Sequence, residues 1–267
     1  MPLSRLANWY VLAELNALSE ETDLTQQQIA DEIGVSSRTI TNYLTGETRP
    51  KAGMAASFAK ACGGNDKRAN FLSHVIKQLD SGKIVSDLDQ RNIFIIERAE
   101  ATYGEMWEWE PWYIPGLLQD PRYHMDLLSG QTDHPMQNWQ RKLRRQITVN
   151  RRAPQPTMRF LVGSTALKPL LGKEWGEAQF QRLVEADQTP NCEVRILDGL
   201  HRGVEHAFTT FHPSVHPKAG PSFVYVEALD QSRHIEEPVK IGLYDVQIKD
   251  LWFRGDGIGG TLDDWVH

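Results

Sequence analysis

Several features that would narrow the class of this protein are scarce or missing. Among its 267 residues there are two cysteines, Cys62 and Cys192. Neither has a neighbouring thiol, so we expect no disulfide framework and no cysteine-based zinc site. No apolar run approaches the ~20 residues that cross a bilayer, and the N-terminus lacks the apolar region of a signal peptide. These absences predict a globular, cytoplasmic protein with no membrane partner.

Positive charge is also in short supply. The chain has 29 Lys and Arg against 35 Asp and Glu, a formal net charge of −6. Residues 1–85 hold nine basic and nine acidic side chains, so the negative excess lies entirely in the later part. A protein with this balance does not coat nucleic acid by bulk electrostatics, and any contact with DNA must therefore be local.

The usual signatures of catalysis are missing as well. Ser164 follows Gly163, but there is no G-x-S-x-G motif, no glycine-rich phosphate loop and no Cys-His-Asn order. A histidine-rich segment runs from His201 to His216, but its spacing is not H-E-x-x-H, and Gly203 disfavours a regular helix there. We expect no enzymatic activity, no bound metal and no cofactor.

The pattern of apolar residues divides the chain into two domains. Residues 6–79 indicate successive short helices, and residues 65–80 and 88–107 form two longer helical stretches separated by a Ser/Gly/Asp-containing joint. We place the boundary near Gly82, which gives an all-helical domain over residues 1–82 and a second domain over residues 83–267 that begins with a helical linker.

The second domain is predicted to be α+β. Strand-like runs occupy residues 158–163, 192–198, 207–212 and 222–227, and helical segments occupy residues 164–171, 176–187 and 238–252. Because the last two runs are joined by a loop alone, the sheet should be mixed and mainly antiparallel. The tail from about residue 255 is expected to be flexible. The fold class is therefore α+β, with an all-α helix-turn-helix domain in front.

The segment 25–46 predicts this helix-turn-helix. Thr25 can cap a first helix whose Ile29 faces inward, Gly34 permits the turn, and Ser36 can cap a second helix that buries Ile40. The outward positions of the second helix carry hydroxyl, guanidinium and amide groups, which form directional hydrogen bonds to base edges and phosphates. The candidate DNA-binding residues are Gln26, Ser36, Ser37, Arg38, Thr39, Thr41, Asn42, Arg49 and Lys51. The alternative is a helical bundle used for protein contact.

Residues 25–50, TQQQIADEIGVSSRTITNYLTGETRP, resemble the XRE (lambda-repressor-like) helix-turn-helix family. The resemblance lies in Thr-Gln, Ile-Ala, Gly-Val-Ser and the later Gly and Pro. Leu44 and Thr45 replace the Glu-Asn or Glu-Arg pair often found before that glycine, so we expect a local ion pair to be absent. The resemblance implies a sequence-specific regulator that binds a pseudo-palindromic operator in double-stranded DNA.

A second resemblance covers most of residues 90–255. The strings at 114–123, 141–146, 190–197 and 224–227 are similar to the uncharacterised domain that follows an XRE module in many actinobacterial regulators. Such regulators are typically encoded beside a small partner protein and are described as antitoxin-like. The resemblance implies control of DNA binding through this domain by a small protein, and a ligand-gated regulator is the alternative.

Two features of the second domain are candidate partner contacts. Residues 141–159 hold seven Arg or Lys and no acid, and residues 107–112 hold three tryptophans. The basic segment is open to three interpretations: a solvated face paired with nearby acids, a surface for an acidic partner, or an extra phosphate contact. The aromatic segment is either core packing or an exposed contact surface. The candidate partner residues are Arg141, Arg144, Arg145, Trp109 and Trp112.

A homodimer is expected from the size of the DNA-binding unit. One recognition helix covers only a few base pairs, and the first domain is close to neutral, so bulk charge does little to strengthen its binding. Useful affinity then requires two modules on half-sites about one helical turn, ~34 Å, apart. The operator sequence, the sign of regulation and the effector stay open.

Overall fold

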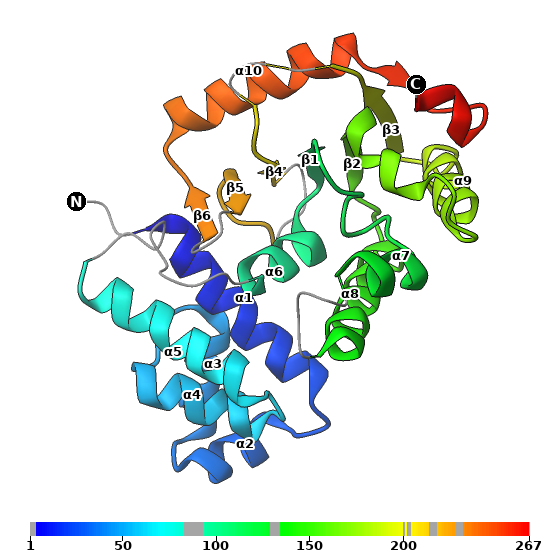
Figure 1. Ribbon diagram of the computed structural model, residues 1–267. Coiled ribbons are helices and arrows are strands. Elements are labelled where there is room, and N and C mark those ends of the chain that lie inside the picture. The colour runs from blue at the N-terminus through cyan, green and yellow to red at the C-terminus, as the bar shows by residue number, and fades with distance from the viewer. Residues whose placement is uncertain are drawn as a thin grey trace.

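The computed structural model of the chain describes residues 4–82, 93–128, 134–199, 201, 204–213, 218–227 and 232–266. It consists of an N-terminal helical bundle and a seven-stranded sheet with helices on both faces (Figure 1). The predicted α+β class, with a helical domain in front, is confirmed.

The bundle has the helices expected over residues 6–79. They are α1 (Arg5–Glu21), α2 (Gln26–Ile33), α3 (Ser37–Thr45), α4 (Ala52–Ala61) and α5 (Asp66–Asp80). Helix α1 is the central element, because it buries Leu6, Tyr10 and Leu18 and packs against α3, α4 and α5. The helix-turn-helix is thereby held on a helix that also reaches the second domain.

The sheet is mixed and mainly antiparallel, as predicted. Its order is β6-β5-β4-β1-β2-β3-β7. Neighbouring β1, β2 and β3 are parallel, and every other neighbouring pair is antiparallel. The strands are β1 (Glu105–Glu110), β2 (Thr157–Gly163), β3 (Cys192–Leu197), β4 (Phe208–His212), β5 (Phe223–Glu227), β6 (Ser232–Ile235) and β7 (Asp256–Gly257).

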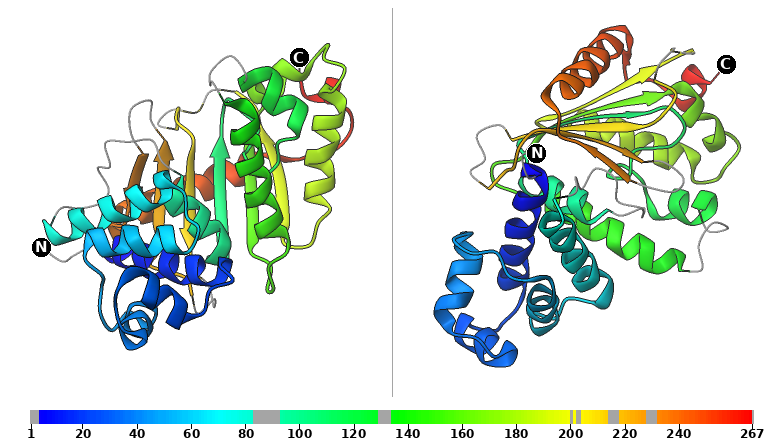
Figure 2. Two further views of the ribbon diagram at one scale, coloured as in Figure 1. Left: turned by 90° about the horizontal axis from the view of Figure 1, so that it is seen from below. Right: turned by 90° about the vertical axis from the view of Figure 1, so that its left-hand side faces the viewer.

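Helices cover the two faces unequally. Among the described residues, α10 (Pro238–Arg254) is the one helix that lies across the first face, where Ile248 and Trp252 pack with Trp107 and Trp109 of β1 (Figure 2). The other face carries α6, α8 and α9, with α7 against α8 and α1 beside α6. These helices are α6 (Phe94–Thr102), α7 (Pro121–Leu128), α8 (Pro135–Asn150) and α9 (Gly176–Asp187).

Two expectations about secondary structure are wrong. Strand β1 begins at Glu105, where a helix through Trp107 was expected, because α6 ends at Thr102 and the following residues alternate between the two faces of the sheet. Residues 164–171 form two short 3-10 turns, Ser164–Ala166 and Lys168–Leu170, in place of one helix. Residues 88–92 of the expected linker helix lie outside the described residues.

The C-terminal tail, for which flexibility was expected, makes regular contacts with the sheet and within itself. Asp256 and Gly257 form β7 against β3. Leu262 is buried in a 3-10 turn, and the indole of Trp265 donates to the carbonyl oxygen of Gly259 at 2.7 Å. Gly260, at φ 73°, permits a tight turn here, and Leu262 belongs to the same apolar cluster as Val194 and Ile196 of β3.

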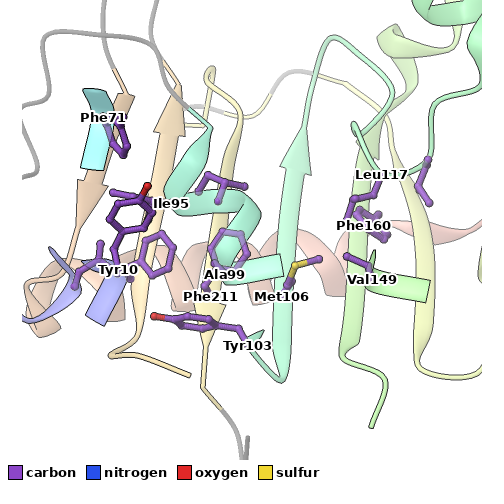
Figure 3. Packing of buried hydrophobic residues seen from close by; sticks show 14 of the residues in the cluster. Tyr10, Phe71, Ile95, Ala99, Tyr103, Met106, Leu117, Val149, Phe160 and Phe211 are labelled. Carbon is purple, nitrogen blue, oxygen red and sulfur yellow. The ribbon is translucent and has the colours of Figure 1, made fainter. Parts of the chain in front are cut away.

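The apolar core is continuous between the bundle and the sheet. Phe71 of α5 stacks on Phe94 of α6 at 5.1 Å, and Trp9 of α1 meets Tyr103 edge-on at the same centroid distance. Figure 3 shows Phe71, Tyr103 and Phe211 in this one cluster. The boundary near Gly82 stays a prediction, since residues 83–92 lie outside the described residues, but the two parts share a core.

Candidate DNA-binding interface

Local hydrogen bonds build the turn as the sequence predicts. Thr25 and Gln28 form a reciprocal capping box at the start of α2. Gly34 ends that helix at φ 73°, a left-handed conformation that a non-glycine side chain resists, and Ser36 Oγ accepts from the Thr39 backbone at 3.1 Å to begin α3. Ile40 is completely buried and fixes the inner side of α3 against the bundle.

The outer side of α3 is polar and exposed. The side chain of Arg38 makes no hydrogen bond or ion pair with any other described residue. Thr41 Oγ1 donates to Gln26 Oε1 at 3.0 Å, so the first turn of α2 and the middle of α3 form one surface. Ser37 lies on the same side, while Ser36 and Thr39 satisfy each other at the cap (2.8 Å). This polar surface lies on a single α-helix, which is the element that the major groove of B-DNA admits.

Asn42 is constrained by an acid that the sequence did not single out. In the amide orientation that satisfies its neighbours, Asn42 donates to the carbonyl oxygen of Arg38 (3.2 Å) and to Glu47 Oε2 (3.0 Å). A contact between Asn42 and a base would have to replace the Glu47 contact. In the sequence, the only indication of this contact is the glutamate directly after Gly46.

The two basic residues after α3 differ in availability. The Arg49 guanidinium donates to Asp80 Oδ1 at 2.7 Å and to Asn8 Oδ1 at 3.0 Å, so it ties the loop to α5 and α1. Lys51 is exposed at the start of α4, and its side chain has no partner among the described residues. The structure therefore favours Lys51 over Arg49 as a backbone contact.

Two arginines of α8, the basic helix of the second domain, are paired with acids of α6. Arg145 pairs with buried Glu100 through two short contacts of 2.5 and 2.7 Å, and Arg141 pairs with Glu97 at 2.5 Å. Placing Arg145 on a partner surface is wrong, because its guanidinium is enclosed with that carboxylate. Arg144 is exposed and has no ion pair within the described parts of the chain.

The tryptophans of residues 107–112 divide in the same way. Trp109 is buried, 3% exposed, and its indole donates to the carbonyl oxygen of Val204 at 2.8 Å, so it is not a partner contact. Trp107 packs against Trp252 of α10. Trp112 is 49% exposed and stays a candidate contact.

A charge network joins the DNA-binding bundle to the sheet domain. Glu14 of α1 is 1% exposed and contacts both Arg68 of α5 and Arg98 of α6, while Glu21 at the end of α1 pairs with the same two arginines. Helix α6 thus binds the bundle through Arg98 and binds α8 through Glu97 and Glu100. In the sequence, the only indication of this network is Glu14 at an inward position of α1, and such an acid is easily taken for a surface charge.

The histidine-rich segment does not come together as a ligand set. His212 Nε2 contacts Asp245 at 2.9 Å, and His201 Nε2 contacts the carbonyl oxygen of Asp198 at 2.9 Å. His216 lies outside the described residues. No group of three His, Cys, Asp or Glu side chains suited to a metal occurs in the described parts of the chain.

A small cavity lies where the three parallel strands end. It has a volume of about 320 Å³ and is lined by Trp109, Trp112, Ser164 and His201, among others. Ser164 Oγ donates to Asp198 Oδ1 at 2.5 Å, and this bond lowers the pKa of the Asp198 carboxyl. Crevices at the carboxyl ends of parallel strands are common ligand sites.

Comparison with known protein families divides the chain as its structure does. Residues 12–71 match a helix-turn-helix domain. Residues 96–254 match a domain of unknown function, DUF5753. The chain belongs to the DUF5753 family. No curated protein and no solved structure matches it. This DUF5753 chain is thus a helix-turn-helix protein, of the type that binds DNA as a regulator.

Over the described residues, none of the helices combines the length and apolar character needed to cross a bilayer.

Proposed function

We propose that this protein is a transcription regulator that recognises a specific DNA sequence by placing α3 in the major groove, as XRE-type regulators do. The observation that carries the proposal is the exposed, unpaired Arg38 beside Thr41 and Asn42 on a helix whose other side is fixed by Ile40. Arginine suits guanine, and asparagine suits adenine. Ser37 and Thr41 supply hydroxyls, and Gln26 and Lys51 contact phosphates.

The protein acts on its operator as a homodimer and performs no catalysis. One α3 contacts too few base pairs for useful affinity, so two copies bind half-sites of a pseudo-palindrome about ~34 Å apart. Local contacts have to carry the binding, because residues 1–85 have no net charge.

The DUF5753 domain controls DNA binding by the helical bundle. It does so by binding a small protein partner, in the antitoxin-like arrangement of actinobacterial regulators of this type. The ion pairs of α6 with α1, α5 and α8 support this, because a shift of α8 would disturb Arg98 and through it Glu14. Arg144 and Trp112 are the two members of the predicted contact set whose side chains are exposed.

A ligand-gated regulator is the second candidate function. The cavity of about 320 Å³ at the ends of β1, β2 and β3 favours it, since that volume suits a small molecule and its wall combines indole rings with hydroxyls.

The decisive experiment is to sequence the DNA fragments that co-purify with the protein and to measure binding to single-base variants of the recovered site at fixed salt. Arg38→Ala should relax preference at particular positions, whereas Lys51→Ala should weaken all sites alike. Unchanged affinity and preference in Arg38→Ala would refute the recognition helix and favour a non-DNA interaction module.

The partner is tested separately with Arg144→Glu. This change should abolish binding of an acidic partner and leave DNA binding intact, because Arg144 lies outside the helix-turn-helix. Arg145 is unsuitable for this test, since its loss would leave the buried carboxylate of Glu100 without its ion-pair partner. Loss of DNA binding in Arg144→Glu would instead assign this residue to a phosphate contact.

A further inference from the structure

A groove of about 870 Å³ lies beside the end of the recognition helix, where the DNA-binding bundle meets the second domain. Its lining comes from α1, from the end of α3 with the loop that follows it, and from residues 219–222 between β4 and β5. Helix α1 packs both on the bundle and on α6 of the second domain (Figure 1). Small-molecule sites typically have volumes of roughly 300–1,000 Å³ and often lie between domains. The groove therefore has the size and the position of a ligand site.

Most of the side chains that line this groove are apolar. Helix α1 contributes Trp9, Val11 and Leu12, and α3 contributes Tyr43. Trp9, Leu12 and Tyr43 are each partly exposed, so their apolar atoms are available to a ligand. Two aromatic rings together with aliphatic side chains favour a ligand with a flat, apolar body.

The wall that the second domain supplies is held in place by α1 and by the residue after α6. The indole of Trp9 donates to the carbonyl oxygen of Lys218 at 2.9 Å, and the hydroxyl of Tyr103 donates to the carbonyl oxygen of Pro221 at 2.6 Å. Gly220 lies against the same indole, because a Cβ atom added to this glycine would lie 2.4 Å from the Trp9 ring. The groove is thus formed before a ligand arrives, so binding requires little ordering of the chain.

The charged side chains that line the groove are all positive. Among the described residues the lining holds two arginines, Arg5 and Arg49, and neither Asp nor Glu. Arg49 is neutralised by Asp80 at 2.7 Å. Arg5 is exposed at the first position of α1, and its side chain makes no hydrogen bond or ion pair with any other described residue. A free guanidinium beside an apolar groove selects a ligand that carries an anionic group.

We propose that this groove binds a small organic acid. The apolar body of the ligand packs against Trp9, Leu12 and Tyr43, and its anionic group pairs with the guanidinium of Arg5. A planar carboxylate matches two parallel N–H groups of a guanidinium, which gives the pair a fixed direction as well as an attraction. The site is distinct from the cavity at the ends of β1, β2 and β3.

A ligand in this groove acts on the recognition helix. Gly46, which ends α3, comes so close to Leu12 that an added Cβ atom would lie 3.3 Å from the leucine side chain. The amide of Asn16 donates to the carbonyl oxygen of Leu44 at 3.0 Å, so α1 sets the position of α3. The acid binds beside these contacts and touches the second domain at the same time. Its binding therefore changes the affinity for DNA, a consequence that rests on the proposed function.

Fluorescence of anilinonaphthalene sulfonate, an aromatic anion that brightens in apolar surroundings, tests the site without DNA. The wild-type protein should bind the dye saturably, and Arg5→Gln should weaken binding about tenfold, because hydrogen bonds between charged groups are the strong ones. Phenylnaphthylamine has the same rings without the sulfonate and should bind both proteins equally.

Arg122→Gln is the matched control for the dye. Arg122 is likewise exposed and unpaired among the described residues, and it lies in the first turn of a helix, α7. Its substitution removes the same charge at a distance from the groove and should leave the dye affinity unchanged. Equal dye affinity of Arg5→Gln and Arg122→Gln would overturn the proposal.

Two further variants show where the dye binds, because α10 also carries exposed apolar side chains such as Val246 (71% exposed). Thr48→Trp fills the groove and should remove dye binding with an unchanged melting temperature, since Thr48 is exposed. Val246→Glu should leave the dye affinity as it is. Loss of the dye in Val246→Glu, with normal binding in Thr48→Trp, would place the dye on α10 and refute the groove.

The effect on DNA is measured with a duplex recovered with the protein. Saturating dye should change the duplex affinity of the wild-type protein about fivefold or more and leave that of Arg5→Gln unchanged. Dye that binds in the groove without changing the duplex affinity would refute the control of DNA binding. If Arg5→Gln weakened binding to every duplex and bound the dye normally, Arg5 would be a phosphate contact and the proposed site would fail. If the wild-type protein bound no duplex at all, the proposed DNA-binding function would fail, and the dye measurements would still decide on the groove.

Discussion

Two helices of this protein carry arginines that look alike in sequence and differ in the structure. On α3, Arg38 extends into solvent with no partner among the described residues. On α8, Arg141 and Arg145 are held by Glu97 and Glu100 of α6. A basic side chain can bind a partner only when its own fold has not already neutralised it, so Arg38 is available for a contact, whereas Arg141 and Arg145 hold α8 to α6.

The acids of α6 cause this difference. Glu97 and Glu100 are three residues apart and therefore lie on one side of α6, which faces α8. In the described parts of the chain, no helix places acidic side chains against the outer face of α3. Glu47 contacts Asn42 there but does not contact Arg38. The following predictions test this contrast, beginning with the largest expected effect.

Arg145→Ala should destabilise the protein strongly. The substitution leaves the carboxylate of Glu100 buried without its partner, and breaking a buried pair in this way costs about 3–5 kcal/mol of unfolding free energy. Thermal or denaturant unfolding measures the loss. Arg144→Ala, one position earlier and exposed, is the control and should change stability by no more than about 0.5 kcal/mol. Equal stability of the two variants would show that the Arg145 pair is not structural.

A second prediction concerns Glu108, which lies on β1 on the side of the sheet that faces α8. Burial, together with the nearby Glu100, raises the pKa of its carboxyl to about 7. The folded protein therefore binds a proton that the unfolded chain has released, and the free energy of unfolding falls as pH rises from about 4.5 to about 7. Glu108→Gln should remove this dependence and add about 1–3 kcal/mol at pH 8.

Unfolding of wild-type and Glu108→Gln proteins between pH 5 and pH 8, with roughly one-unit steps, checks the prediction. The two stability curves should converge toward the acid end, where Glu108 is protonated in the folded protein. Parallel curves would mean that Glu108 is ionised throughout.

Arg38→Ala and Asn42→Ala should affect DNA binding and leave stability unchanged. Each removes directional contacts to bases worth about 1–3 kcal/mol and relaxes preference at particular positions. The effect of Asn42→Ala should be the smaller one, because a contact between Asn42 and a base first has to displace Glu47. Binding to single-base variants at fixed salt, with melting curves in parallel, measures both quantities. A larger loss in Asn42→Ala would show that Glu47 does not restrain the amide.

The sequence predicted local structure well and long-range partners poorly. The caps at Thr25 and Ser36 and the turn at Gly34 depend on neighbouring residues, so the helix-turn-helix was visible from the pattern alone. The partner of Arg145 is 45 positions earlier in the chain, and no local rule pairs the two. Strand β1 was missed for a similar reason: its alternation is meaningful only once α10 is known to cover one face of the sheet.

Lys51→Ala should have the smallest effect. It tests the contrast between paired and unpaired basic side chains outside the recognition helix. Lys51 is exposed and unpaired among the described residues, like Arg38, but it lies at the start of α4, beyond the recognition helix. Its loss should weaken binding by less than about 1 kcal/mol, equally for every base variant, and should reduce the dependence of log affinity on log salt by about one phosphate contact. Arg49→Ala should instead lower stability, because Arg49 already pairs with Asp80. The opposite result would be a flatter salt dependence in Arg49→Ala and an unchanged one in Lys51→Ala. It would mean that the ion pair between Arg49 and Asp80 opens on DNA. An arginine that is paired in the free protein could then still contact the DNA backbone.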